Sequence, residues 1–194
     1  MNIPGITWQG ESIEDVEILR ALPADLVRLL SHRNGFIVHD GAVHVRGACL
    51  TPDWHSLRVA WRGPKSFSVL YPEVKPSDIP FAQDQVGDQF LIREGTILRL
   101  FAETGQIESC ADSVEDFFSR LSRDIEGFLN VGFSHKMQPG QLLHAFPPFC
   151  FQESGGSSSL KPLPSSEVIL FHADLARQIR DVPDGGQVEF KVTD

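Results

Sequence analysis

The stretch PFAQDQVGDQF places two carboxylates, those of Asp84 and Asp88, four residues apart around a glycine. Two carboxylates beside a turn could share a hard cation, but acids at turns more often accept hydrogen bonds from free backbone N–H groups. Carboxylate sites for hard cations also assemble more than two oxygen ligands. The sequence therefore favours a turn-stabilising role for this pair, and we expect neither a metal nor another cofactor.

Other catalytic chemistry has no recognisable pattern in the sequence. Neither a GxSxG elbow nor a phosphate-binding loop of the GxxxxGK[ST] or GxGxxG type occurs. None of the seven histidines has a zinc-binding spacing, and His39 and His44, which flank a glycine turn, are expected on a solvated hairpin. Cys49, Cys110 and Cys150 form no CxxC pair, which indicates free buried thiols in a reducing compartment. We therefore expect a protein that is not an enzyme.

Charge is concentrated in the middle of the chain. The whole protein has a net charge of −9, and eleven acids stand against four arginines between residues 78 and 126. Such a segment repels the phosphates of nucleic acids and attracts a basic protein. The alternative is that these acids only solvate the surface. The candidate contacts for a basic partner are Asp84, Asp88, Glu94 and Glu103.

Two tryptophans are further candidates for partner binding. Trp54 and Trp61 have the aromatic character of interface anchors. The alternative is that they belong to the core, where a tryptophan in a strand is more often found because its indole is a large apolar group. If either ring is exposed, we expect it to anchor a partner.

The elements that must position these residues begin with two helices. Ser12 and Asp15 resemble a capping box, which predicts a helix to about Leu22. Pro23 suits the first turn of a second helix, which Asn34 and Gly35 end. Runs of β-branched and aromatic residues then predict antiparallel strands, because the connections are too short for crossover helices. The predicted strands are 42–45, 57–61, 67–71, 89–93, 97–101 and 106–108.

The last part of the chain is predicted to hold two more helices. Ser113 is a good N-cap, and Val114, Phe117, Phe118, Leu121 and Ile125 mark one apolar stripe after it. The segment 135–165 is rich in proline, glycine and serine, which is typical of a loop. A helix over 166–181 follows, with Val168, Phe171, Leu175, Ala176 and Ile179 on its inner face, and then a strand over 188–192.

Composition places these elements in one globular protein. Hydrophobic residues make up 41% of the 194, enough for one domain with an appendage, so we expect an α+β domain over 1–130 and a C-terminal extension over 131–194 packed on it. The N-terminus has neither the basic nor the apolar region of a secretion signal, and no apolar run approaches the ~20 residues that span a bilayer. We therefore expect a cytoplasmic protein that does not contact membranes.

Three segments resemble the motifs of the SUKH superfamily, in the order that the superfamily has them. LPADLVRLLSHRNGF (22–36) is similar to its opening motif, IPFAQDQVGDQFLI (79–92) to its central motif and ESCADSVEDFFSRL (108–121) to its closing motif. The resemblance covers about 22–126 and leaves the segment from residue 135 onward unaccounted for. It implies a curved antiparallel sheet flanked by helices.

The resemblance also implies a binding role without catalysis. Bacterial members of the superfamily are largely immunity proteins that bind and neutralise toxins, often nucleases or deaminases, and fungal members regulate cell-wall synthesis through partners. We therefore expect a non-enzymatic domain that neutralises a cognate, basic protein toxin by direct binding. The alternatives are an intracellular regulatory or scaffolding module that binds a host protein, and a small-molecule-binding enzyme whose groups only the fold brings together.

Overall fold

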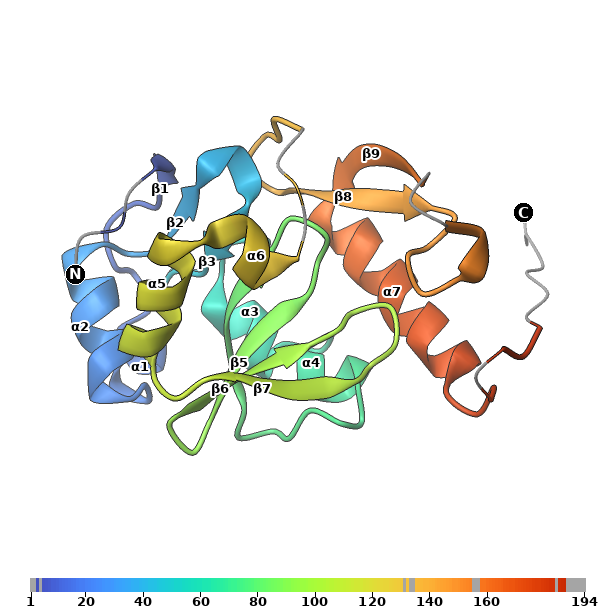
Figure 1. The fold of residues 1–194 in the computed structure, drawn as a ribbon. Coiled ribbons are helices and arrows are strands. Elements are labelled where there is room, and N and C mark those ends of the chain that lie inside the picture. The colour runs from blue at the N-terminus through green and yellow to red at the C-terminus, as the bar shows by residue number, and fades with distance from the viewer. Residues whose placement is uncertain are drawn as a thin grey trace.

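A seven-stranded antiparallel sheet forms the centre of the protein in a computed structural model, which describes residues 3, 5–130, 132, 135–154, 158–183 and 185–187. The strands follow one another in the sheet in chain order, so every connection joins neighbours. The sheet is open rather than closed into a barrel, and helices cover it, as Figure 1 shows. The fold is therefore α+β, as the sequence predicts. The seven strands are β1 (Ile6–Gln9), β2 (Phe36–Val38), β3 (Val43–Val45), β4 (Ile79–Asp84), β5 (Gln89–Arg93), β6 (Thr96–Leu100) and β7 (Ile107–Ala111).

Helices pack on both faces of this sheet. Side chains alternate along β5, so Phe90 and Ile92 enter one core and Leu91, between them, enters the other. The first core contains residues of α1, α2, α5 and α6, and the second contains residues of α4 and α7. The helices are α1 (Val16–Arg20), α2 (Ala24–His32), α3 (Leu57–Arg62), α4 (Phe67–Leu70), α5 (Val114–Arg123), α6 (Ile125–Leu129) and α7 (Ser165–Ile179), with 3-10 turns η1 (His39–Gly41) and η2 (Gln152–Ser154).

The first core is built around aromatic rings. Phe117 of α5 is fully buried and has four phenylalanine neighbours, with ring centroids between 4.8 and 5.5 Å away. Most of these pairs meet edge to face, the arrangement that aromatic quadrupoles prefer. The prediction of an apolar stripe on this helix is confirmed, because Phe117 and Leu121 are both buried. The four neighbours are Phe81, Phe90, Phe118 and Phe128.

Two of the predicted strands are wrong, because 57–61 and 67–71 fold as helices α3 and α4. Leu57 and Ala60 are buried three residues apart, which is the spacing of one helix face. Ser56 caps the first of these helices by accepting a hydrogen bond from the Val59 N–H at 3.3 Å. A short apolar run does not distinguish strand from helix by periodicity, so this cap decides the structure of α3.

The C-terminal segment contains a hairpin that the sequence did not predict. Strands β8 (Gln141–Phe146) and β9 (Ser159–Pro164) pair antiparallel within the stretch predicted as a loop. The two prolines of β9, Pro162 and Pro164, argue against a strand, yet an edge strand tolerates proline. The predicted strand over 188–192 lies outside the described residues.

The last predicted helix is confirmed as α7, which lies beside the large sheet and below β8 and β9 in Figure 1. Its Ala173 and Ala176 pack against Leu91 and Leu100 of the sheet. Phe171, predicted on the inner face, is instead 38% exposed. Within the described residues, no helix combines the length and the apolar content needed to cross a membrane.

Replacing the central ring tests this account of the core. We expect Phe117→Ala to lower the free energy of unfolding by about 3–5 kcal/mol, because it leaves a cavity among four rings. Val69→Ala is the control, since Val69 is exposed and should change the value by less than about 0.5 kcal/mol. Urea denaturation followed by circular dichroism measures both. Equal effects of the two substitutions would contradict the packing described here.

Candidate functional site

Arg99 of β6 joins the two carboxylates that the sequence singled out. Its Nε donates to Oδ2 of Asp88 at 2.9 Å, and its Nη2 donates to Oδ2 of Asp84 at 2.9 Å. Nη2 also donates to the carbonyl oxygen of Leu129, the last residue of α6, at 2.9 Å. One guanidinium thus connects the β4–β5 turn, strand β6 and the end of a helix.

The remaining oxygens of the two carboxylates hold backbone. Oδ1 of Asp84 accepts from the N–H groups of Val86 and Asp88, both at 3.0 Å. Oδ1 of Asp88 accepts from the Ala102 N–H at 2.8 Å. Asp84 and Asp88 therefore stabilise turns, as the sequence favours, and the guanidinium occupies the position between them that a shared cation would need.

Two acids share one arginine here, and that imbalance changes their acidity. Burial raises the pKa of Asp84, and the neighbouring charge of Asp88 raises it further. Burial likewise raises the pKa of Asp88, while Arg99 opposes both shifts. Both shifts favour the protonated carboxyls, and a further cation placed beside them would favour the charged forms.

A third acid fixes the connection between β8 and β9. The carboxylate of Glu103 accepts hydrogen bonds from the N–H groups of Phe149 and Cys150, at 3.0 and 2.8 Å. These contacts span 46 and 47 residues of chain. Burial raises the pKa of Glu103, whereas the two N–H donors lower it. The C-terminal segment is thereby attached next to the cluster of Arg99, Asp84 and Asp88, which we call the Arg99 corner.

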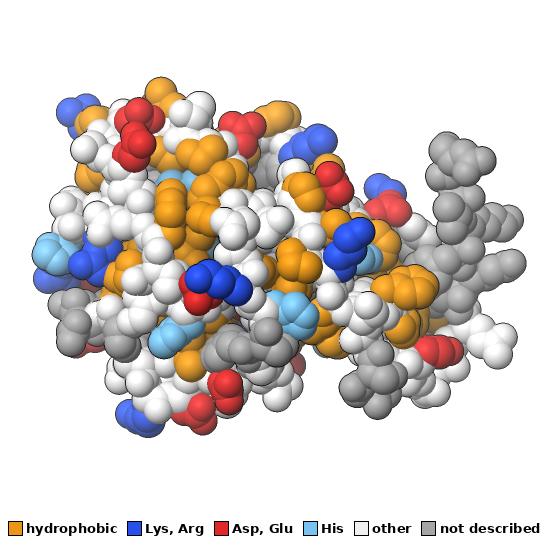
Figure 2. All heavy atoms as spheres, turned by 90° about the horizontal axis from the view of Figure 1, so that it is seen from above, with side chains coloured by type: hydrophobic (Ala, Val, Ile, Leu, Met, Phe, Trp, Pro, Cys, Tyr) orange, Lys and Arg blue, Asp and Glu red, His pale blue; other side chains and the backbone are white. Residues whose placement is uncertain are grey.

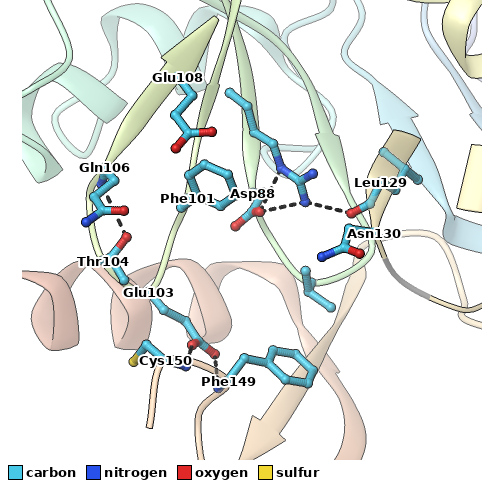
Figure 3. Close-up of a pocket in the computed structure, with 12 residues that line it drawn as sticks. Asp88, Phe101, Glu103, Thr104, Gln106, Glu108, Leu129, Asn130, Phe149 and Cys150 are labelled. Atoms are coloured by element: carbon cyan, nitrogen blue, oxygen red, sulfur yellow. Dashed lines mark hydrogen bonds and ion pairs between the residues drawn. The ribbon is translucent and has the colours of Figure 1, made fainter. Parts of the chain in front are cut away.

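The Arg99 corner and the Glu103 attachment enclose a cavity of about 400 Å³, drawn in Figure 3. Three carboxylates and one guanidinium line it, and the exposed acid among them, Glu108, lies directly across from Arg99 on β7. Its apolar wall includes Phe101, whose ring centroid is 5.0 Å from the guanidinium carbon, and Phe149, which is 45% exposed. We call this the acidic cavity. Its charged lining residues are Asp88, Arg99, Glu103 and Glu108.

The chemistry of the acidic cavity suits a cation. Carboxylates and aromatic faces are the two partners that a guanidinium or ammonium group takes in proteins, and the lining contains both. The thiol of Cys150 also lines the cavity, but burial and the nearby Glu103 together raise its pKa to about 12. A thiol that stays protonated at neutral pH is a poor nucleophile.

The other acids predicted as contacts lie in different places. Asp84 is fully buried behind Arg99, so direct contact between its carboxylate and a partner is not compatible with the structure. Glu94 is exposed in the turn between β5 and β6, at the end of this hairpin opposite to Asp88. The structure thus brings Asp88 and Glu103 together in one cavity and leaves Glu94 outside it.

Neither tryptophan is a free surface anchor. Trp61 is half-buried on α3, where its Nε1 donates to the Pro76 carbonyl at 3.0 Å and Arg62 lies over its ring. Trp54 is half-buried between Trp8 and His44, with ring centroids 5.1 Å away in each case. Both rings belong in large part to the scaffold, which is the alternative that the sequence left open.

The histidines and cysteines require three corrections. His44 was expected on a solvated hairpin, but it is buried beside His55, and its Nε2 lies 2.8 Å from Nδ1 of that residue. Burial lowers the pKa of His44 well below its usual range and that of His55 to about 4, so both rings are neutral at pH 7. All three cysteines are free, as predicted, but Cys150 is exposed and Cys110 is only half-buried.

Sequence reasoning missed three residues of the cavity: Arg99, Glu108 and Phe149. A cation inside the run ILRLF was a usable indication, because a charged side chain among strand apolar residues normally has a buried partner. Glu108 carries no such indication until the register across from Arg99 is known. Phe149 comes from the segment predicted as a loop, and only the fold places it here.

Removing the shared guanidinium should expose its role. We expect Arg99→Gln to lower the free energy of unfolding by about 3–5 kcal/mol at pH 8, because it leaves two buried carboxylates without a countercharge. A carboxyl whose folded pKa is raised stabilises the protein below its unfolded pKa, and the contribution disappears as pH rises through the folded value. Because Arg99 opposes both upward shifts, the loss should shrink between pH 8 and pH 5.

Urea titrations at the two pH values measure this effect. Arg120→Gln is the matched control, since Arg120 pairs with Asp116 at the surface and its loss should cost at most about 1 kcal/mol. A loss in the Arg99 variant that stays constant between pH 8 and pH 5 would show that the carboxylates are not its cause.

Comparison with known proteins extends the description of the fold. No family model matches the chain, and no curated protein sequence matches it. Among solved structures, the chain is similar to Atu4351 from Agrobacterium tumefaciens, known from a crystal structure, with a TM-score of 0.55 and 14% sequence identity. The similarity covers 88% of this chain and 85% of that one. At this identity the likeness concerns the fold alone, and it includes most of the C-terminal segment.

Proposed function

We propose that this protein is a non-enzymatic binding domain that neutralises a basic protein toxin by docking it at the acidic cavity. The observation that carries the proposal is the lining of this cavity, where three carboxylates stand against one guanidinium beside exposed aromatic side chains. A basic side chain of the toxin would enter the cavity. The resemblance to the SUKH superfamily adds the expectation that the toxin is a nuclease or a deaminase.

The surroundings of the cavity favour a protein over a small cation. Phe149 in the cavity lining is 45% exposed, and Phe146, three residues before it at the end of β8, is 71% exposed. The face of the molecule to which β8 and β9 belong carries hydrophobic patches between scattered charges (Figure 2). An exposed aromatic anchor beside a charged rim is typical of protein interfaces. In such interfaces aromatic residues contribute much of the affinity, and charged residues increase the association rate.

The direction of the charge supports a basic partner in particular. Nucleases and deaminases that act on nucleic acid need positive surfaces, because their substrate is a polyanion. An acidic inhibitor would cover the same surface and accelerate encounter by electrostatic steering. Burial raises the pKa of Asp88 and Glu103, so a cation beside them would stabilise their charged forms. A guanidinium from a toxin would offset that charge.

The decisive measurement is binding to the protein encoded by the gene next to this one. We expect a purified complex whose association rate falls at least about tenfold between 50 and 500 mM salt. Glu108→Lys should reduce association on the order of tenfold at low salt, because this acid is exposed and lines the cavity. Phe149→Ser should accelerate dissociation instead.

Glu115→Lys is the control, since it makes the same charge change at an exposed position on α5. The two alternative functions predict other results. A scaffolding module would bind a host protein and give no protection when the neighbouring gene is expressed, and an enzyme would turn over a small molecule. Protection from toxicity that survives both Glu108→Lys and Phe149→Ser would place the interface elsewhere.

A further inference from the structure

Arg46, the residue after β3, is a buried cation whose hydrogen-bond partners are all neutral. Its side chain donates to the carbonyl of Pro80 at 2.8 Å and to the side-chain oxygens of Gln83 and Gln89 at 2.6 and 2.7 Å. The residue is 2% exposed. Among the described residues no carboxylate pairs with it, and burial is the one cause that acts on its pKa. Arg46 thus contrasts with Arg99, which has two acids.

The groups behind Arg46 supply no charge either. Gln83 accepts from Arg46 and lies 3.4 Å from Nδ1 of His44, which in turn contacts His55. Both histidines are neutral, as argued above. Nε2 of His55 lies 3.2 Å from the carbonyl oxygen of Asn34, which is the last group in this series of contacts. Burial lowers the pKa of Arg46 to about 9, which still leaves it protonated at neutral pH. A full positive charge therefore stays inside the protein, and the part of the chain that the structure describes gives it no counterion.

In front of Arg46 lies a second cavity, of about 430 Å³, which we call the Arg46 cavity. Phe67, whose ring centroid is 5.2 Å from the guanidinium carbon, shares its wall. Lys65 adds a second cation, and Asp53 is the one acid among the lining residues. The rest of the wall is largely apolar and comes from α3, α4 and α7: Val59, Ala60, Leu70, Ile169 and Leu170, with Trp54 at one side.

The start of α7 also lines this cavity. Ser165 and Ser166 form its first turn, and in the described part of the chain no side chain caps this helix end. The first N–H groups of a helix carry partial positive charge, which favours an anion nearby. The partial charge of this helix end is smaller than the charge of Arg46, but it has the same positive sign. The cavity therefore combines a buried guanidinium, a lysine and a helix start with apolar walls.

We propose that the Arg46 cavity binds a small organic acid, with its carboxylate toward Arg46 and its apolar body against the side chains of α3, α4 and α7. A carboxylate would accept from a guanidinium N–H group that Pro80, Gln83 and Gln89 leave free, and it would supply the counterion that the described residues do not provide. The volume of the Arg46 cavity lies within the roughly 300–1,000 Å³ that is typical of small-molecule sites. Apolar walls with a few polar groups are also typical of such sites. The site is separate from the acidic cavity and independent of toxin binding.

The scaffold role of Arg46 does not account for these features. Its hydrogen bonds tie β4 and β5 to the end of β3, and a neutral donor would do this without burying a charge. A buried charge is tolerated when a partner compensates it, and here the described residues provide none. The cavity in front of the guanidinium, with Lys65 at its wall, is the place from which an external anion would do so.

Phenylacetate and its uncharged analogue 2-phenylethanol test the proposal on the whole protein. Isothermal titration calorimetry should detect phenylacetate binding, with at least about tenfold weaker binding of 2-phenylethanol, because a hydrogen bond to a charged group contributes more than about 1.4 kcal/mol. Lys65→Met should weaken phenylacetate binding by roughly threefold, since Lys65 supplies its charge at a more exposed position than Arg46. Ile169→Trp should abolish binding of both compounds by filling the cavity.

Arg46→Met should remove the preference for phenylacetate, and its circular dichroism spectrum shows whether the variant folds. If it does not fold, Lys65→Met and Ile169→Trp still decide the matter. Glu108→Lys, in the acidic cavity, should leave phenylacetate binding unchanged. Equal binding of the two compounds, no binding of phenylacetate at millimolar concentration, or full binding by Ile169→Trp would each overturn the proposal.

Discussion

Arg99 holds together three parts of the protein that are distant in the chain. Its guanidinium contacts the turn between β4 and β5 through two carboxylates, and the end of α6 through the Leu129 carbonyl. Because Asp88 also accepts from the Ala102 N–H, the same ion pair fixes the turn that leads from β6 to β7. The aromatic core lies next to this corner, since Arg99 stands 5.9 Å from the Phe90 ring centroid. The register of the central strands and the position of α6 therefore depend on one buried charge cluster.

Arg46 and Arg99 differ in the sign of the charge that surrounds them. Arg99 faces two carboxylates with a third across the strand, so its environment retains negative charge. Arg46 has amide and carbonyl oxygens and retains its positive charge. Each arginine lines a cavity. A buried charge that its own protein leaves uncompensated is costly, so each cavity is a place where a ligand of opposite charge gains more than at an ordinary surface.

The sequence predicted the elements that have strong local determinants. Helix α5 follows from the Ser113 cap and a clear apolar stripe, and the strands β5 and β6 follow from β-branched runs on either side of Gly95. Asp84 and Asp88 were recognised as turn-stabilising acids from their place beside Gly87. The segments 57–61 and 67–71 were mistaken for strands because runs of four or five residues fit both periods. Burial of His44 could not be predicted, since it depends on Trp54 and His55 packing from another part of the chain.

The candidate site was less predictable, because both cavities are completed by the part of the chain that local patterns describe least. Phe149 and Cys150 close the acidic cavity, and the start of α7 closes the Arg46 cavity. The segment from residue 135 onward lies outside the SUKH resemblance and has the proline and glycine content of a loop. Glu103 attaches it through two backbone N–H groups, and Ala173 and Ala176 dock it on the sheet. With this attachment the C-terminal segment forms part of the wall of both cavities, beside groups from the central sheet, its turns and the helices α3, α4 and α6.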